Sequence, residues 1–254
     1  MIVTFLGTGT SQGVPVVACT CAVCLSADKH DKRLRTSIMI EDEGKVVVID
    51  SGPDFRYQML RENVMHLDAL VFTHEHKDHV AGMDDIRAFN FKQNRAMDIY
   101  AVPRVQQALK HEFSYIFDEF QYPGIPKVNL ITIENDQPFN VGGIGFMPIE
   151  VMHYKLPVLG FRIKDFTYIT DAKTISDKEK AKVRGTKVLI VNALQKQEHI
   201  SHFTFDEAIA FAKEIGAEKT YLIHIGHRLG KHADVSKELP AGIELAYDCL
   251  KLEL

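Results

Sequence analysis

Short apolar runs recur along the whole chain, and turn-forming residues separate most of them. They are four to ten residues long and rich in valine, isoleucine, phenylalanine and threonine, which is typical of strands that are buried on one or both faces. The pattern predicts strands at residues 2–6, 37–40, 45–49, 69–73, 98–102, 128–133, 144–153, 159–163, 166–169, 188–192 and 220–225.

Four other stretches carry apolar residues at helical spacing, at residues 54–62, 104–112, 177–183 and 204–215. The last has clear ends, because Thr204 stands where an N-cap belongs and Gly216 follows the final periodic position. Many strands with interspersed helices fit two packed sheets that are covered by helices. The pattern therefore predicts an α/β (α+β) fold, but it does not fix the topology.

Length and composition favour one large core. The chain has 254 residues, 46% of them hydrophobic, and no repeat or linker divides it, so we expect a single domain over residues 1–254. The apolar runs are too short to cross a bilayer and residues 1–5 lack the start of a signal peptide, so we expect a cytoplasmic protein with no membrane partner. A formal net charge of −4 provides no general attraction to nucleic acid.

The strongest chemical signal follows the predicted strand at 69–73. His74, His76, Asp78 and His79 fall within six residues. A polar surface loop explains a lone pair of histidines, but a denser cluster beside a buried strand needs partners. Imidazole and carboxylate groups together suit zinc and related divalent metals, with positions left for water. We therefore predict a metal site, with the first two histidines on one metal and Asp78 with His79 on a second.

Three further ligand-type residues follow other predicted strands: His153, Asp171 and His224. Taken alone, His153 or His224 would more often be a hydrogen-bonded core histidine, and Asp171 could cap the helix that follows it. Their order after the first cluster resembles the metallo-β-lactamase fold superfamily, whose signature is His-x-His-x-Asp-His followed by a distant His, an Asp and a final His. Asp50 matches the early aspartate of that superfamily, so the resemblance covers nearly the whole chain.

The resemblance implies an αββα sandwich, with two mixed sheets face to face and helices outside. It also implies two Zn²⁺ or Mn²⁺ ions in one binuclear centre. The implied ligands are His74, His76 and His153 for one metal, Asp78, His79 and His224 for the other, and Asp171 for both. True β-lactamases carry a different residue at the position of Asp171, which disfavours antibiotic hydrolysis. Asp78 and Asp171 are therefore also expected to serve catalysis.

A cysteine cluster provides a second metal signal. Cys19, Cys21 and Cys24 lie within six residues, whereas Cys249 stands alone. This layout does not suit a disulfide framework, and short cysteine spacings in a reducing compartment more often bind metal. The ordinary alternative is that these cysteines are small buried hydrophobes. Three thiolates and one histidine form a standard structural zinc set.

The fourth ligand of such a zinc stays open on the residues alone, with His227, His232 and His30 as candidates. The opening at residues 7–15, the cysteine cluster and the final His-x-x-His resemble the PhnP branch of the superfamily. That branch carries a structural zinc, and on this resemblance we prefer His227. Its members are phosphodiesterases that open phosphoribosyl 1,2-cyclic phosphate, which implies a small, cyclic phosphodiester substrate and a metal-bridged hydroxide.

Related phosphodiesterases also place a proton-donating histidine in the stretch that holds His202, so we expect His202 to protonate the leaving group, with His199 as the alternative. Both could instead be loop residues near a helix start. Arg228 and Lys231 could neutralise a terminal phosphate, or could be an ordinary solvated pair. Backbone amides of the glycine-rich loop at 7–13 could approach phosphate, or the glycines could serve only the turn.

Other activities remain possible at this stage. A tRNA 3′-processing endoribonuclease would share the ligand set, but no basic arm for RNA is present, so nucleic acid is an improbable partner. A thioesterase or lactonase would attack an acyl carbon with the same metals. A non-enzymatic zinc protein, in which the histidines only stabilise a binding surface, would be free to lose several of the seven ligands, and all seven are present. The aromatic segment at 113–122 could form a lid or the contact of a homodimer, although packing is the more frequent explanation.

Overall fold

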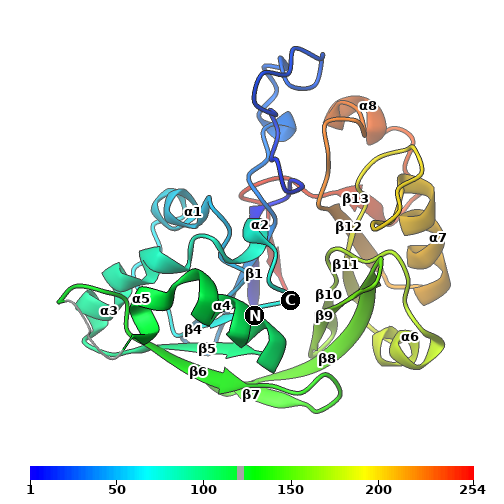
Figure 1. The fold of residues 1–254 in the computed structure, drawn as a ribbon. Helices are drawn as coiled ribbons and strands as arrows, with labels where there is room; N and C mark the ends of the chain where they lie inside the picture. Colours follow the sequence, from blue (N-terminus) through cyan, green and yellow to red (C-terminus); the bar gives the residue numbers. More distant parts are fainter. Residues whose placement is uncertain (119–122) are drawn as a thin grey trace.

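The computed structural model describes residues 1–118 and 123–254 and contains two seven-stranded sheets (Figure 1). The strand order in the first sheet is β14-β1-β2-β3-β4-β5-β6, and in the second it is β13-β12-β11-β10-β9-β8-β7. The strands of the first sheet are β1 (Ile2–Gly7), β2 (Ser37–Asp42), β3 (Lys45–Ile49), β4 (Ala69–Val71), β5 (Met97–Ala101), β6 (Val128–Thr132) and β14 (Lys251–Glu253).

The second sheet mixes antiparallel strands with a parallel set formed by β10 to β13. Its strands are β7 (Phe139–Val141), β8 (Ile144–His153), β9 (Leu156–Ile163), β10 (Phe166–Tyr168), β11 (Val188–Asn192), β12 (Lys219–Ile223) and β13 (Ile243–Leu245). The first sheet also combines antiparallel pairs, from β1 to β3, with parallel pairs, from β3 to β6. Both sheets are therefore mixed, and with the helices they form the αββα sandwich that the resemblance implies.

Helices gather over both sheets, with α1, α3, α4 and α5 beside the first sheet and α6 and α7 beside the second (Figure 1). No helix among the described residues is long and apolar enough to span a bilayer. The helices are η1 (Lys29–Asp31), α1 (Phe55–Arg61), α2 (Lys77–Val80), η2 (Met83–Ile86), α3 (Arg87–Gln93), α4 (Pro103–Glu112), α5 (Ser114–Phe117), α6 (Asp177–Val183), α7 (Phe205–Ile215) and α8 (His232–Val235).

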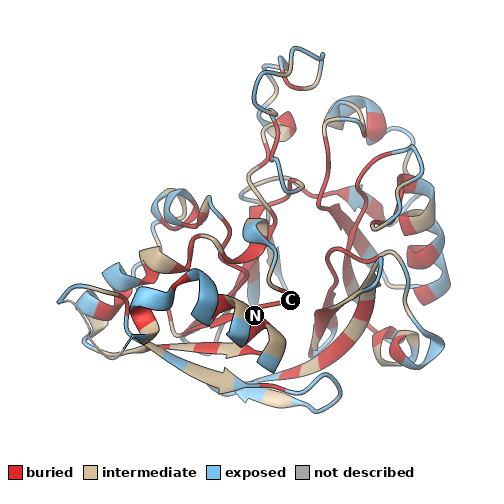
Figure 2. Ribbon diagram, in the orientation of Figure 1, coloured by how far each residue is buried: buried red, intermediate tan, exposed pale blue. Residues whose placement is uncertain are grey.

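One hydrophobic core joins the facing sides of the two sheets (Figure 2). Phe5 and Ile38 of the first sheet and Phe146 and Phe161 of the second are all fully buried in it. Burying a side chain of this size stabilises a fold by about 1.5–3 kcal/mol. A second cluster packs α7 against the outer side of the second sheet. The strand ends that carry the candidate ligands are thus held by packed cores on both sides.

The predicted ends of α7 are confirmed. The Thr204 hydroxyl accepts a hydrogen bond from the Glu207 amide, and the Glu207 carboxylate accepts one from the Thr204 amide. Such a reciprocal capping box satisfies two amides that the helix leaves free. Gly216 ends the helix with φ of 70°, a left-handed conformation that glycine adopts without strain.

The sequence pattern missed the shortest elements. The strands β7, β13 and β14 have three residues each, and α2, α5 and α8 have four, too few for an apolar period to show. The edge strand β14 is held by antiparallel pairing with β1, a contact between the two ends of the chain. Only the tertiary fold creates such a contact.

Candidate metal centre

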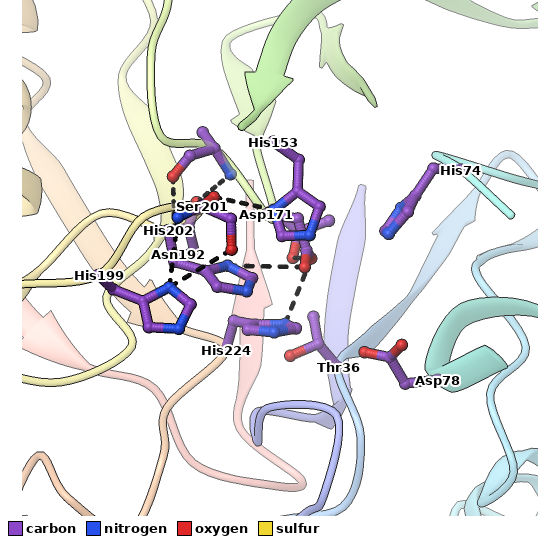
Figure 3. Close-up of polar contacts among 12 residues, drawn as sticks. Thr36, His74, Asp78, His153, Asp171, Asn192, His199, Ser201, His202 and His224 are labelled. Carbon is purple, nitrogen blue, oxygen red and sulfur yellow. Dashed lines mark hydrogen bonds and ion pairs between the residues drawn. The ribbon is translucent and has the colours of Figure 1, made fainter. Parts of the chain in front are cut away.

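The seven predicted ligands converge at one edge of the sandwich. His74 to His79 follow β4, His153 ends β8, Asp171 follows β10 and His224 follows β12. In Figure 3, His74 and Asp78 face His153, Asp171 and His224 from the opposite side of the site. Both sheets therefore contribute to one cluster.

The second predicted ligand set is compact. The ligand atoms of Asp78, His79, Asp171 and His224 all lie within 4.8 Å of one another. Nε2 of His79 is 3.2 Å from Oδ2 of Asp78 and 3.2 Å from Oδ2 of Asp171. Nδ1 of His224 is 3.3 Å from the same oxygen of Asp171. Two imidazoles and two carboxylates at these separations can share one divalent cation.

The histidines of the first predicted set are neighbours of one another. Ring centroids are 4.6 Å apart for His74 and His76, and 5.1 Å apart for His76 and His153. Ligand atoms of His153, Asp171 and His202 also lie within 4.8 Å of one another. The structure thus brings all seven predicted residues together and adds His202 at their margin.

Four buried imidazole nitrogens in this cluster make no hydrogen bond, although three of them lie near a carboxylate, which is the arrangement expected of ligands for a cation. Nε2 of His74 and of His79, and Nδ1 of His202 and of His224, are buried without a hydrogen bond to any described residue. Buried polar atoms are normally paired, and leaving them unpaired costs free energy. Imidazole nitrogens that converge on carboxylates fit divalent metals of the zinc and manganese type.

Neighbouring groups fix which nitrogen of His79 and of His153 faces the cluster. Asp50 is fully buried, and its carboxylate accepts hydrogen bonds from Nδ1 of His79 at 2.7 Å and from the Thr73 amide and hydroxyl at 2.9 and 2.8 Å. Nδ1 of His153 donates to the Ser201 carbonyl at 2.8 Å. In both histidines Nε2 is left for a metal, which is how outer partners orient metal ligands.

Two of the ligands, and the Asp50 that supports them, stand on strained backbone. Asp50, Asp171 and His224 have φ of 64°, 57° and 54°, in the left-handed region that residues with a side chain rarely adopt. The Asn192 side chain accepts from the Ala172 amide at 2.7 Å and donates to the Ala172 carbonyl at 3.0 Å. This pair of bonds holds the turn that carries Asp171.

Charge and burial set the protonation of these groups in the absence of metal. Burial acts to raise the pKa of Asp171, but His224 and His79 hold it well below its usual range. Burial lowers the pKa of His74 well below its ordinary value. The pKa of His79 lies well above its ordinary value in spite of burial, because Asp78 and Asp171 surround it. A metal at Nε2 of His79 must therefore displace a proton.

His202 lies at the edge of the cluster, between Asp171 and His199 (Figure 3). Its Nδ1 is 3.7 Å from Oδ1 of Asp171, and its ring stacks on His224 with centroids 4.8 Å apart. Burial lowers the pKa of His202 to about 3, so the ring is neutral at pH 7 in the free protein. The alternative donor, His199, is partly exposed, and its ring centroid is 5.1 Å from that of His202.

The cysteine cluster is also brought together, and with His227. Nδ1 of His227 lies 3.3 Å from the sulfur of Cys19 and 3.5 Å from those of Cys21 and Cys24. A tetrahedral zinc with bonds of about 2.3 Å to sulfur and about 2.05 Å to nitrogen separates two such ligands by about 3.5 Å. The arrangement therefore fits a zinc. The Cys24 amide donates a hydrogen bond to the Cys21 sulfur and lowers the pKa of Cys21 to about 6.

The competing zinc ligands lie in a different cluster. His30 and His232 stack on each other with centroids 4.9 Å apart. Nδ1 of His30 is hydrogen-bonded to the Asp28 carboxylate, and Nδ1 of His232 is 3.1 Å from the guanidinium of Arg33. The structure therefore favours His227 as the fourth ligand.

The glycine-rich loop after β1 packs against backbone. A Cβ atom at Gly7 would lie 1.9 Å from the Arg35 carbonyl oxygen. The amides of Gly9 and Gly13 already donate to the carbonyls of Leu34 and Thr10. These glycines serve close approach between segments, and their amides are not available to a phosphate.

The aromatic segment at 113–122 is only partly described, since 119–122 lie outside the described residues. Phe113 and Ile116 are buried against the first sheet's core, as the packing explanation expected. Tyr115 is 41% exposed and donates to Asp84. A lid or dimer contact at this segment stays a prediction.

Comparisons with known proteins agree with this geometry. The family described as Beta-lactamase superfamily domain matches residues 45–225. A crystal structure of a new diphosphatase from the PhnP family is 39% identical, with a TM-score of 0.93 over 100% of this chain and 97% of that one. Zinc-bound PqqB from Methylobacterium extorquens, at 19% identity and a TM-score of 0.79 over 100% of both chains, shares the fold.

A curated relative, an octanoyltransferase of Porphyromonas gingivalis, is 40% identical over 248 residues, which is 97% of this chain. The chain spans 50% of the length of that relative. The name octanoyltransferase therefore describes a protein of which half lies outside the matched region.

The fold and the strand-end cluster together define a metal-dependent hydrolase. The chain belongs to the beta-lactamase superfamily, in its PhnP-like branch.

We expect Asp50→Asn to weaken metal binding by about 10- to 100-fold. The asparagine side chain is neutral and has only one oxygen, so it is a poorer acceptor for the proton on Nδ1 of His79 and orients that ring less firmly. Metal affinity would be measured by titrating the metal-free protein with Mn²⁺ or Zn²⁺. Asp206→Asn, an exposed acid on α7, is the matched control. Equal affinities for the two variants would contradict the orienting role of Asp50.

We expect Cys24→Ala to remove one zinc per chain, measured by elemental analysis of the purified protein, since three ligands hold zinc less tightly than four. Cys249→Ala is the matched control, because Cys249 is exposed and lies outside the cluster. Retention of that zinc in the Cys24 variant would show that the cysteines are structural thiols.

Proposed function

We propose that the protein is a phosphodiesterase that hydrolyses a small, cyclic phosphodiester such as phosphoribosyl 1,2-cyclic phosphate. The observation that carries this proposal is the position of Asp171. Its Oδ2 lies 3.2–3.3 Å from His79 and His224, and its Oδ1 lies 3.7 Å from Nδ1 of His202. Ligand atoms of His153, Asp171 and His202 lie within 4.8 Å of one another. A carboxylate so placed can be shared by two cations.

The proposed ligands follow from this geometry. His74, His76 and His153 would hold one Zn²⁺ or Mn²⁺, and Asp78, His79 and His224 the other, with Asp171 shared. Two such cations would supply a nucleophilic hydroxide at neutral pH and positive charge for the phosphoryl oxygens. A third ion, Zn²⁺, would be held by Cys19, Cys21, Cys24 and His227.

The chain itself contributes orientation and a proton. The Ser201 carbonyl and the Asp50 carboxylate keep His153 and His79 in the tautomers that present Nε2. The leaving alkoxide needs a proton, and His202 lies beside the cluster and is not one of the proposed ligands. An anionic substrate next to the ring opposes the effect of burial and raises the pKa of His202 toward the working range.

The diphosphatase of the PhnP family supports phosphoryl chemistry, since it is 39% identical over nearly the whole length. Human tRNase Z, short form, is 19% identical with a TM-score of 0.71 over 100% of this chain and 99% of that one, and supports the fold alone. With a net charge of −4, this chain has no general attraction for a tRNA backbone. An acyl substrate is the remaining alternative.

We expect the purified protein to hydrolyse bis-p-nitrophenyl phosphate when Mn²⁺ or Zn²⁺ is added, with release of p-nitrophenolate as the measurement. Asp171→Ala should remove this activity, because it deletes the shared ligand. Asp206→Ala should retain it, which controls for contaminating enzymes and for handling. Absence of turnover with both metals would redirect the proposal to thioester or lactone substrates.

We expect His202→Ala to lower kcat by about 10²- to 10⁴-fold for a diester with an alkoxide leaving group. The loss should be much smaller for bis-p-nitrophenyl phosphate, because p-nitrophenolate leaves without a proton. His199→Ala tests the alternative donor under the same conditions. Equal losses on both substrates would show that His202 acts on the metals or the fold and donates no proton.

A further inference from the structure

The turn between β8 and β9 places an exposed tyrosine directly after a proposed metal ligand. His153 ends β8 and pairs with Leu156 at the start of β9, so Tyr154 and Lys155 form a two-residue turn. Tyr154 is 52% exposed. Because successive Cα atoms lie about 3.8 Å apart, the tyrosine side chain is within reach of a group attached to a substrate held at His153.

The backbone of this turn is strained at the tyrosine. Tyr154 has φ of 57°, whereas Lys155 lies outside the left-handed region. Glycine is the usual first residue of a two-residue turn of this kind, because it adopts positive φ without strain. For a bulky aromatic residue the same conformation is unusual, and such strain is found mainly at segments that contact ligands. The hairpin would fold at lower cost with glycine, so the benefit of the tyrosine lies in something other than folding.

The Tyr154 ring has one face that is not covered. The ammonium of Lys155 lies over the ring, 5.3 Å from its centroid. In the part of the chain that the structure describes, no aromatic ring stacks on Tyr154, and about half of the residue is open to solvent. The ring therefore adds little to the core and keeps a surface on which a planar group can stack.

A second exposed apolar side chain flanks the same edge of the metal centre. Ile200 is 65% exposed and precedes Ser201, whose carbonyl accepts the hydrogen bond from Nδ1 of His153 (Figure 3). Tyr154 and Ile200 are thus the chain neighbours of the two residues that share this bond. Single apolar residues are ordinary on a protein surface, but an aromatic ring and a branched side chain beside a reaction centre are typical of a ligand site.

We propose that Tyr154 is a specificity residue that stacks on a planar aromatic group, such as a nucleobase, carried by the sugar of the cyclic phosphodiester. Ile200 provides a second apolar contact for that group. This inference rests on the proposed phosphodiesterase function and narrows its substrate class. Stacking needs no particular hydrogen bonds from the base, so different bases are tolerated. The contact is the same before and during displacement at phosphorus, so it acts mainly on KM.

The test compares adenosine 2′,3′-cyclic phosphate with methyl β-ribofuranoside 2,3-cyclic phosphate, which has the same reacting group and no base. We expect the wild-type holoenzyme to prefer the adenosine compound by about 5- to 150-fold in kcat/KM, the effect of one stacked base. Tyr154→Ala should remove most of this preference, mainly through KM, and Tyr154→Phe should retain it. Tyr57→Ala is the matched control, because Tyr57 is an exposed tyrosine on α1 with a cation, Arg61, over its ring.

Glycine at the same position separates binding from folding. Tyr154→Gly removes the ring and also the backbone strain. We therefore expect the Tm of this holoenzyme to equal that of the wild type or to exceed it by about 2–4 °C, while the preference for the adenosine compound is lost.

The outcomes separate the inference from the function on which it rests. Turnover of both compounds with equal kcat/KM in the wild type, or a preference that Tyr154→Ala leaves intact, would overturn the stacking role alone. A Tm of Tyr154→Gly well below that of the wild type, with equal losses on both compounds, would show that the ring supports the hairpin and would also overturn it. Failure to cleave either compound, with Mn²⁺ or Zn²⁺ supplied, would overturn the proposed phosphodiesterase and this inference together.

Discussion

The buried carboxylate of Asp171 is the group on which the site depends, because it attracts histidines that otherwise repel one another. His79 and His224 both lie within 3.3 Å of its Oδ2, and His79 disfavours the charged form of His74. In a low-dielectric interior such a cluster is stable only when its lone pairs and charges are compensated. Divalent cations provide that compensation, so occupancy of the centre and stability of this edge of the sandwich are linked.

This requirement explains where the backbone is strained. Left-handed φ values at Asp50, Asp171 and His224 cost about 1–3 kcal/mol each, and they persist only where surrounding bonds fix them. Asn192 fixes the turn at Asp171 with two hydrogen bonds to Ala172. Close packing does the same for the metal loop, since a Cβ atom at Gly52 would lie 2.0 Å from the Asp78 carbonyl oxygen. The centre is thus held by rigid strand ends on both sheets.

The two-sheet fold and the seven residues of the candidate metal centre could be predicted from the sequence, because these residues directly follow apolar strands and stand in a recognisable order. The sequence could not predict Asn192 or the Ser201 carbonyl, whose roles arise only when β8, β10 and β11 come together. The edge strands β7, β13 and β14 were missed because three residues are too few to show an apolar period. The glycine-rich loop was ambiguous in sequence, and its packing against Arg35 decides for a structural role. The single domain over 1–254, the cytoplasmic location and the homodimer stay predictions.

The segment that follows β12 connects the two metal clusters through four consecutive residues, His224 to His227. His224 faces Asp171, the Ile225 carbonyl accepts from the Thr10 amide, and His227 lies beside the three cysteines. A zinc at the cysteines would therefore fix the segment after β1 against the strand that carries a catalytic ligand. That segment has few buried apolar side chains of its own between Gly7 and Arg35, so its position depends on such a tether.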